Sequence, residues 1–360
     1  MNDTDVLLDA TTALVPPLLT GIDVLGHAGR HMHPPNIPQL IGEIEPYRAP
    51  LAEGLEAFNA VQWPEHLQGF AATARKGAEL LLQSFNEFLS SQNQSNPTMG
   101  AYRAMGYNTK ATEAIYPMSA MLPPVSRFFL HPEQREDEAL LARIAQADAN
   151  RDNVGVMHAA NASDDRGGFS MYVPEYYDGE TVPLIVALHG GSGHGRSFLW
   201  TWLRTARSRN AIVISPTSKE GTWSLMGPDV DSANLNAMVG YARENWQIDP
   251  DRILLTGMSD GGTFSYVSGL QADSPFTHLA PSSASFHPML VEVADGERLK
   301  ELPIYLMHGA LDWMFPVDVA RTAQQALSAA GAKVEYREIA DLSHTYPVEE
   351  NPRIIDWLLA

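Results

Sequence analysis

The chain has 360 residues, of which 44% are hydrophobic, so it is long enough to bury one large core together with an accessory layer or a second small domain. Its 43 acidic and 24 basic side chains give a formal net charge of −19. A surface of this sign repels phosphate backbones and anionic lipid, which argues against nucleic acids and membrane surfaces as partners. The lack of cysteine excludes disulfides, thiolate catalysis, Cys-based zinc sites and iron–sulfur clusters.

The N-terminal segment MNDTDVLLDA is acidic and has no basic region ahead of an apolar stretch. We therefore expect no signal peptide. The sequence also has no run of about 18 consecutive apolar residues, so we expect no membrane span. Together these features predict a cytoplasmic protein.

Residues 1–150 show helical patterns and no convincing strand pattern. Apolar residues recur at spacings of three and four between residues 67 and 89, which places them on one stripe of a long helix that begins near Pro64. Shorter helices are expected over residues 50–61 and 132–147. We expect this region to form an N-terminal helical extension or cap. It either limits access to a substrate, as lids do, or provides the subunit interface of a homo-oligomer.

Residues 151–360 show alternating strand and helix patterns and are expected to form the catalytic domain. The expected strands cover residues 153–160, 168–175, 182–190, 211–216, 252–257, 277–285, 303–309 and 333–339. The expected helices cover residues 197–209, 233–246, 264–271, 317–331 and 352–360. The first two strands are expected to pair as a hairpin. Beyond them, the alternation predicts an α/β fold with a mostly parallel sheet, helices on both faces, and reactive groups at the carboxyl ends of the strands.

The sequence GMSDG predicts a sharp turn between the strand expected at 252–257 and the helix that follows it. At the apex of such a turn Ser259 has a strained backbone, and only glycine fits two residues before and two residues after it, at Gly257 and Gly261. The serine hydroxyl then projects above the edge of the sheet, so Ser259 is the candidate nucleophile. The alternative is a glycine-rich turn with an inert serine.

A serine hydroxyl needs a base that removes its proton, and a histidine base needs a carboxylate that fixes its tautomer. His344 follows the last expected strand, and Asp312 follows the strand before it. The order Ser259, Asp312, His344 is the order in which this kind of sheet carries a catalytic triad. Asp341 is a rival carboxylate, but it lies three residues before His344 and is more typical of a turn.

Acyl transfer also needs two amide donors for the carbonyl oxygen on which negative charge develops. The amide of Asp260, at the start of the helix, is one candidate, and we expect its side chain to face away from the site. The second donor is expected from the segment LHGGSGHG, with Gly191 as the candidate and Gly190 shaping the turn. A phosphate loop is the alternative for this glycine-rich segment, but it lacks the GK[ST] of a P-loop.

Several aromatic residues fall near the same edge of the predicted sheet. Trp223, Trp313 and His287 are candidates for the wall of a substrate pocket, together with their neighbours Met314 and Phe286. The alternative for each of them is ordinary core or loop packing. Trp200 and Trp202 lie on an expected helix against the sheet and are assigned to packing.

The remaining histidines are assigned to structure. His189 and His308 each precede a glycine at a strand end and are expected to brace loops through hydrogen bonds. His27, His31 and His33 resemble a metal-binding cluster, but position 28 is alanine, so the H-E-x-x-H pattern fails and no second ligand cluster is evident. We expect no metal and no cofactor.

Four segments together resemble a known group of enzymes: LHGGSG, DPDRILLTGMSDGG, HGALDWMFP and LSHTYP. They look like α/β-hydrolase serine esterases of the carboxylesterase/phospholipase and polyhydroxybutyrate-depolymerase-like branch. The resemblance covers roughly residues 150–360 and implies the α/β-hydrolase fold. It gives Ser259, Asp312 and His344 the catalytic roles, and the amides of Gly191 and Asp260 the oxyanion hole. Residues 1–150 match no family that we can name.

These observations predict a serine hydrolase that cleaves small to medium uncharged carboxylic esters through an acyl-enzyme intermediate. Two alternatives remain open. The segments GMSDGG and HGALDWMFPV also resemble the catalytic domains of prolyl-oligopeptidases, which act on amides, although that family carries a β-propeller and the first 150 residues look helical. The second alternative is a binding protein that keeps the fold without catalysis.

Overall fold

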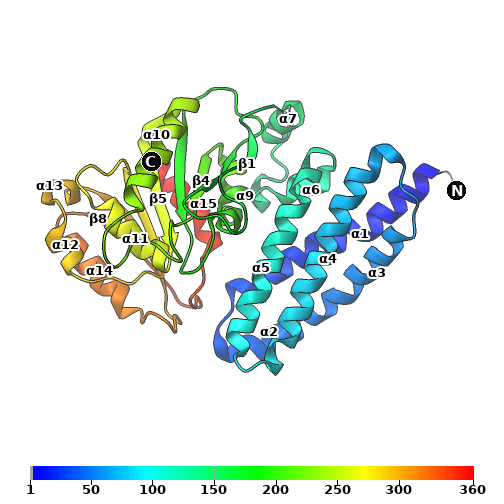
Figure 1. Ribbon diagram of the computed structural model, residues 1–360, viewed down its shortest axis with the longest axis horizontal. Helices are drawn as coiled ribbons and strands as arrows, with labels where there is room; N and C mark the ends of the chain where they lie inside the picture. Colours follow the sequence, from blue (N-terminus) through cyan, green and yellow to red (C-terminus); the bar gives the residue numbers. More distant parts are fainter. Residues whose placement is uncertain (1–2, 149–150) are drawn as a thin grey trace. The chain divides into compact units, whose positions relative to one another are not determined.

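The computed structural model describes residues 3–148 and 151–360 (Figure 1). The chain forms two compact units, residues 1–129 (unit 1) and residues 130–360 (unit 2). The expected boundary between residues 150 and 151 therefore needs correction. Leu130 and helix α7 (Glu138–Gln146) belong to unit 2 because Leu130 and Leu140 pack against Tyr176 in one apolar cluster.

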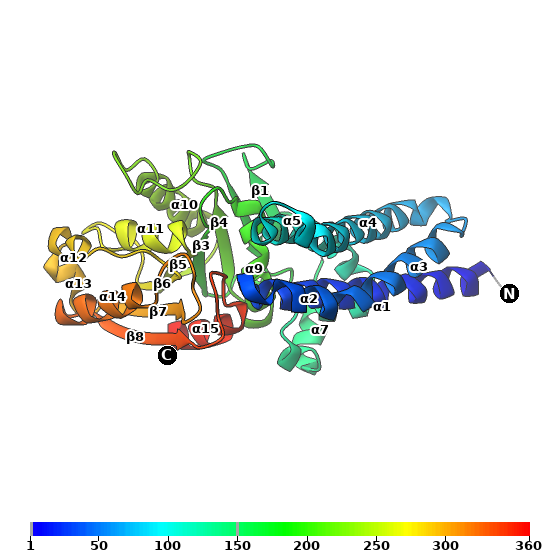
Figure 2. The same ribbon diagram turned by 90° about the horizontal axis from the view of Figure 1, so that it is seen from below.

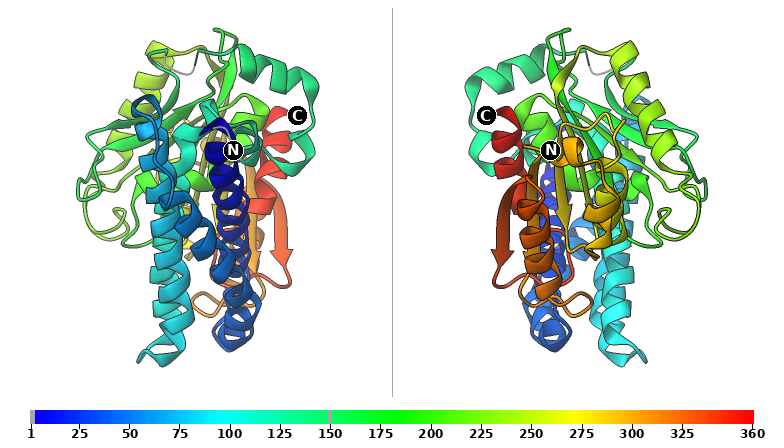
Figure 3. Two further views of the ribbon diagram at one scale, coloured as in Figure 1. Left: turned by 90° about the vertical axis from the view of Figure 1, so that its right-hand side faces the viewer. Right: turned by 90° about the vertical axis from the view of Figure 1, so that its left-hand side faces the viewer.

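The described residues of unit 1 form helices and loops and no strand, as expected. Its helices are α1 (Asp3–Arg30), α2 (Ile37–Ile44), α3 (Arg48–Asn59), α4 (Gln68–Ser90), α5 (Pro97–Ile115) and α6 (Pro123–Phe128), joined in part by short 3₁₀ turns. The long helices run lengthwise beside one another, α4 against α5 and α1 against α3 (Figure 3, blue to cyan). The apolar stripe predicted for this long helix forms the buried face of α4, with Phe70, Leu81 and Phe85 inside unit 1. The role of this unit as a cap or an interface stays a prediction.

Helix α1 does not bear out the expectation that the chain has no membrane-spanning segment. Its residues Thr4–Arg30 reach a mean hydropathy of 1.3 in an 18-residue window, so the helix is long and apolar enough to cross a bilayer by length and composition. A third of that window is buried, with Leu14, Leu18 and Leu25 fully inside the protein. Core helices of soluble proteins and signal sequences pass the same test, so the helix is weak evidence for a membrane location.

Unit 2 contains an eight-stranded sheet with the order β1-β2-β4-β3-β5-β6-β7-β8. Its strands are β1 (Gly155–Ala159), β2 (Phe169–Val173), β3 (Val182–Leu188), β4 (Ile212–Pro216), β5 (Ile248–Met258), β6 (His278–Ser282), β7 (Pro303–Gly309) and β8 (Lys333–Ile339). β1 and β2 form the expected antiparallel hairpin, and β2 also pairs antiparallel with β4. From β4 to β8 all pairings are parallel. This topology confirms the predicted α/β-hydrolase fold.

Helices cover both faces of this sheet (Figures 1 and 2). After α7 they are α8 (Gly195–Phe198), α9 (Trp200–Arg209), α10 (Ser232–Asn245), α11 (Asp260–Gly269), α12 (Met289–Val293), α13 (Gly296–Leu299), α14 (Asp318–Ala329) and α15 (Asn351–Leu359). Side chains of α10, α11 and α14 share one core with alternate residues of β3, whereas α9 and α15 contact each other on the opposite face. All seven residues of β3 are buried, as expected for a strand covered on both faces. The short helices α8, α12 and α13 were not predicted, because four or five residues carry no periodic signal.

The close approach of α3 to α1 generates a prediction about stability. A Cβ atom at Gly54 would lie 2.4 Å from the carbonyl oxygen of Ala13 and 3.1 Å from the Cα of Leu14, so Gly54→Ala must push two backbones apart. We expect this substitution to lower the free energy of unfolding by about 1–3 kcal/mol. Gly106→Ala, inside α5 with nothing within 4 Å, is the control and should raise stability by up to about 1 kcal/mol. Urea titration followed by circular dichroism measures the free energy of unfolding of both variants. A gain in stability for Gly54→Ala as large as that for Gly106→Ala would contradict the close contact at Gly54.

Candidate active site

The turn between β5 and α11 has the strained geometry predicted for it. Ser259 has φ 55° and ψ −118°, a backbone conformation that residues other than glycine rarely adopt. A Cβ at Gly257 would lie 2.6 Å from the backbone of Gly261, and one at Gly261 would lie 2.5 Å from the carbonyl oxygen of His189. The amide of Ser259 donates to the carbonyl of Ser282 at 2.9 Å. This packing fixes Ser259 at the carboxyl edge of the sheet.

The three residues predicted as a triad form one hydrogen-bonded chain. The Nε2 atom of His344 lies 3.1 Å from Oγ of Ser259, and its Nδ1 atom lies 2.9 Å from Oδ2 of Asp312. An ionised carboxylate only accepts hydrogen bonds, so Nδ1–H donates to Asp312 and Nε2 is left to accept the serine proton. All three residues are at least nine-tenths buried. The loops after β5, β7 and β8 thus bring together residues far apart in the sequence.

Asp312 is held by its own loop as well as by the histidine. Its Oδ1 atom accepts hydrogen bonds from the amides of Met314 and Phe315, both at 2.9 Å. Burial raises the pKa of Asp312, but the hydrogen bonds from His344 and from these two amides outweigh it, so the pKa lies below its ordinary value. The carboxylate therefore stays ionised and keeps its orientation toward His344.

The two residues expected to supply oxyanion donors lie together beside Ser259. Asp260 is the first residue of α11, so its N–H has no acceptor within the helix. Gly191 lies so close to it that a Cβ there would sit 2.6 Å from the Asp260 carboxylate. At Gly190 a Cβ would sit 3.6 Å from the Cβ of Ser259. The loop after β3 and the start of α11 thus lie next to the candidate nucleophile.

The side chain of Asp260 turns toward the loop after β4. Its carboxylate accepts a hydrogen bond from Oγ1 of Thr222 at 2.6 Å and lines a cavity that Gly191 also borders. The missing side chain at Gly191 leaves the space that the carboxylate fills. The sequence could not show this, because Thr222 lies 38 residues earlier on the loop after β4.

The cavity beside Gly191 and Asp260 measures about 670 Å³. Its wall consists of Gly191, Ser192, Glu220, Gly221, Thr222, Trp223, Ser224, Leu225, Met226, Pro228, Val230 and Asp260. Two of these residues carry carboxylates and three carry hydroxyls, and none of these twelve described residues is basic. The cavity therefore offers acceptors and hydroxyls next to the candidate oxyanion donors, in a field that disfavours anions.

The candidate pocket residues have different surroundings. Trp223 borders the cavity, but it is only 3% exposed, stacks on Phe264 and donates from Nε1 to the carbonyl of His189 at 2.7 Å. It is thus a core residue with one surface in the cavity wall. Trp313 and His287 are exposed, and neither belongs to the described wall of this cavity. Their pocket roles stay predictions, as does that of Gly190 in shaping the turn.

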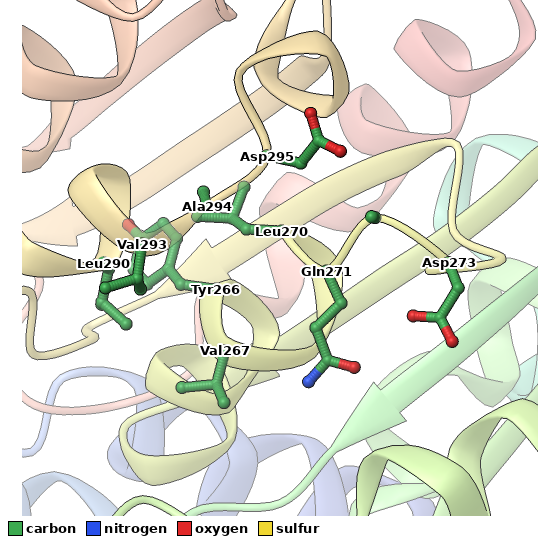
Figure 4. Close-up of a pocket in the computed structure, with 10 residues that line it drawn as sticks. Tyr266, Val267, Leu270, Gln271, Asp273, Leu290, Val293, Ala294 and Asp295 are labelled. Carbon is green, nitrogen blue, oxygen red and sulfur yellow. The ribbon is translucent and has the colours of Figure 1, made fainter.

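A second cavity, of about 570 Å³, lies between α11 and the segment that carries α12 (Figure 4). Tyr266, Leu290, Val293 and Ala294 gather on one side of it, and the side chains of Gln271 and Asp273 lie on the other. The wall contains no residue that the sequence marked for catalysis. The helix α11 was expected, but α12 has only five residues and carries no periodic signal, so the cavity between them was not predicted.

The other singled-out residues serve packing and loop contacts. His189 is buried; its Nδ1–H donates to the carbonyl of Gly190 at 2.7 Å, and its Nε2 accepts from the amide of Ser218 at 3.1 Å. Trp202 is fully buried on α9. The rings of His27 and His31 lie 4.2 Å apart. Within residues 3–148 and 151–360, no group of three or more His, Asp or Glu side chains is arranged to hold a metal ion.

Comparisons with known proteins agree with this architecture. Residues 229–359 match the model of a family described as Phospholipase/Carboxylesterase. The bifunctional acetylxylan esterase/xylanase XynS20E of Neocallimastix patriciarum is 27% identical over 180 residues, which cover 47% of this chain and 25% of that protein. An acetylxylan esterase of Coprinopsis cinerea is 28% identical over 113 residues, which cover 27% of this chain and 30% of that protein. The chain thus spans a quarter to a third of the length of these relatives.

Solved structures also resemble this chain. A thermostable esterase matches 57% of this chain and 61% of its own chain, with 20% sequence identity and a TM-score of 0.46. SOBER1 of Arabidopsis thaliana matches 50% of this chain and 98% of its own, with 20% identity and a TM-score of 0.42.

The buried His189 generates a prediction about pH. Burial lowers the pKa of His189 from 6.5 to about 4. Between these two pH values the unfolded chain therefore binds a proton at this residue that the folded chain does not bind. Stability contributed by His189 is therefore complete above pH 6.5 and is lost as the pH falls toward 4, by at most about 3 kcal/mol. Urea unfolding at pH 7 and pH 4.5 measures the loss, and the His189→Gln variant should show a smaller one. Equal losses in both proteins would contradict this assignment.

Proposed function

We propose that this protein hydrolyses carboxylic esters through a serine nucleophile, because unit 2 has the topology of an α/β-hydrolase and residues 229–359 match a phospholipase/carboxylesterase family model. The observation that carries the proposal is the hydrogen-bonded chain from Ser259 through His344 to Asp312, with distances of 3.1 and 2.9 Å. A buried serine, an imidazole with its acceptor nitrogen turned to that serine, and an ionised carboxylate behind the imidazole are the parts that acyl transfer requires.

In this mechanism Oγ of Ser259 attacks the ester carbonyl carbon while Nε2 of His344 takes the serine proton. Asp312 stabilises the imidazolium and keeps its ring in place. The amides of Gly191 and Asp260 donate to the oxygen that becomes negative, and each such donor contributes roughly 3 kcal/mol to the transition state. His344 then gives its proton to the departing alcohol. Water, deprotonated by the same histidine, cleaves the acyl-enzyme and restores Ser259.

The substrates proposed are small to medium uncharged esters. The cavity beside Gly191 and Asp260 supports this proposal, because its carboxylates disfavour an anionic substrate and its hydroxyls suit a polar, neutral one. Two relatives are acetylxylan esterases. Acetyl esters of carbohydrates are therefore the first natural substrates to try.

The alternatives fit these observations less well. Prolyl-oligopeptidase-like amidases carry a β-propeller, whereas residues 3–129 here contain helices and no strand. A binding protein without catalysis would not require a strained serine whose hydroxyl lies 3.1 Å from a histidine nitrogen. Parallel assays on matched esters and aminoacyl-amides separate the first alternative, and labelling by a fluorophosphonate probe separates the second.

Replacing the nucleophile is the direct test. Ser259→Ala should lower kcat for 4-nitrophenyl acetate by at least about 10³-fold and abolish fluorophosphonate labelling, because no oxygen remains to form the acyl-enzyme. The matched control is Ser328→Ala, which removes an exposed hydroxyl on α14 and should change neither readout. Circular dichroism checks the fold of both variants. Wild-type turnover in Ser259→Ala would overturn the proposal.

The charge of the cavity gives a second test, on substrate choice. 4-Acetoxybenzamide and 4-acetoxybenzoate carry the same acetyl ester, and the second has a negative carboxylate where the first has a neutral amide of similar shape. We expect kcat/KM to be about tenfold lower for the anion at low salt, because Glu220 and Asp260 repel it. Glu220→Gln removes one of the two charges and should reduce the ratio by severalfold. A ratio that neither salt nor Glu220→Gln changes would contradict the electrostatic argument.

A further inference from the structure

We propose that His308, a second buried histidine, is a positioning residue that holds the loop carrying Asp312 and so orients both Asp312 and His344. The inference rests on the proposed serine-esterase function. His308 contacts both Asp312 and Phe315, the first and last residues of the segment 312–315, whose amides hold the triad carboxylate.

His308 lies next to the last residue of β7, and its side chain is fully buried. Its Nε2–H donates to the carbonyl of Phe315 at 2.9 Å. The same nitrogen lies 3.5 Å from Oδ2 of Asp312, the carboxylate oxygen that also receives the hydrogen bond from His344. One N–H group thus faces two acceptors that belong to one short loop.

Phe315 connects these contacts to the triad in three ways. Its carbonyl accepts from His308, its amide donates to Oδ1 of Asp312 at 2.9 Å, and its ring meets the His344 ring edge-on with centroids 5.5 Å apart. A shift of Phe315 would therefore move the donor that holds Asp312 and the ring that packs on His344. His308 holds Phe315 at its carbonyl, while the amide of Phe315 holds Asp312.

The protonation state of His308 suits this role. Burial lowers its pKa, an effect that the Phe315 carbonyl and the Asp312 charge partly offset. The neutral ring must keep its proton on Nε2 to donate to Phe315, and Nδ1 has no hydrogen-bond partner in the part of the chain that the structure describes. A fixed neutral tautomer presents a donor toward Asp312 without adding a full charge that would compete with the imidazolium of His344.

The variants His308→Met and His308→Gln test the proposal. Both replace the imidazole with an unbranched chain that reaches a similar distance, but only glutamine has an amide N–H where Nε2 of His308 lies. For 4-nitrophenyl acetate we expect His308→Met to lower kcat by about 10- to 100-fold with KM within about twofold, because a small misplacement of catalytic groups costs this much. His308→Gln should recover kcat to within about threefold of the wild type.

A spectroscopic readout separates positioning from mere packing. The proton shared by Nδ1 of His344 and Asp312 should give a strongly downfield proton NMR signal in the wild type, and His308→Met should broaden or shift it while His308→Gln restores it. Equal loss of kcat in both variants at unchanged NMR signal would assign His308 to packing alone. Full activity and an unchanged signal in His308→Met would overturn the proposal. If His308→Met does not fold, His308→Asn, whose amide is too short to reach Phe315, replaces it with the same expectations.

This design distinguishes failure of the inference from failure of the proposed function. A wild type that neither hydrolyses esters nor reacts with a fluorophosphonate would end the esterase proposal. The NMR comparison of the His308 variants would still report whether His308 positions the pair formed by Asp312 and His344, because that readout needs no turnover.

Discussion

The constraint on which the rest of unit 2 depends is the turn that holds Ser259 at a positive φ. The turn closes only because the backbone at Gly261 touches the carbonyl of His189 and the backbone at Gly257 touches Gly261. These contacts press the end of β3 against the start of α11. The same packing therefore places Ser259 at the edge of the sheet and brings the loop that carries Gly191 next to Asp260.

A second layer of hydrogen bonds makes this arrangement chemically useful. Backbone amides hold one oxygen of Asp312, His344 takes the other, and the resulting fixed tautomer leaves Nε2 turned to Ser259. Each group is buried, so an unmade bond would leave a costly unpaired polar atom. The energetic need to satisfy these atoms and the chemical need to orient them thus favour the same geometry.

The cavity beside Gly191 and Asp260 adjoins the residues proposed as oxyanion donors. The carboxylate of Asp260 stands in the cavity wall while its backbone opens α11, so one residue contributes in two ways to the same region. Its partner Thr222 comes from the loop after β4, as do most of the other residues of the wall. Loops rather than strands therefore form the wall of this cavity, as is usual around sites that a rigid sheet supports.

The sequence by itself determined the strands and long helices of unit 2, the sharp turn at Ser259, and the candidates Asp312 and His344, because apolar periodicity and glycine spacing are local signals. Only the tertiary structure decided the distances between these candidates, the position of the Asp260 side chain and the contacts of His308. It also moved the boundary between the units, since Leu130 packs on Tyr176, and it buried Trp223 on Phe264. Each of these features depends on contacts between residues far apart in the chain, and such contacts leave no periodic mark in one sequence.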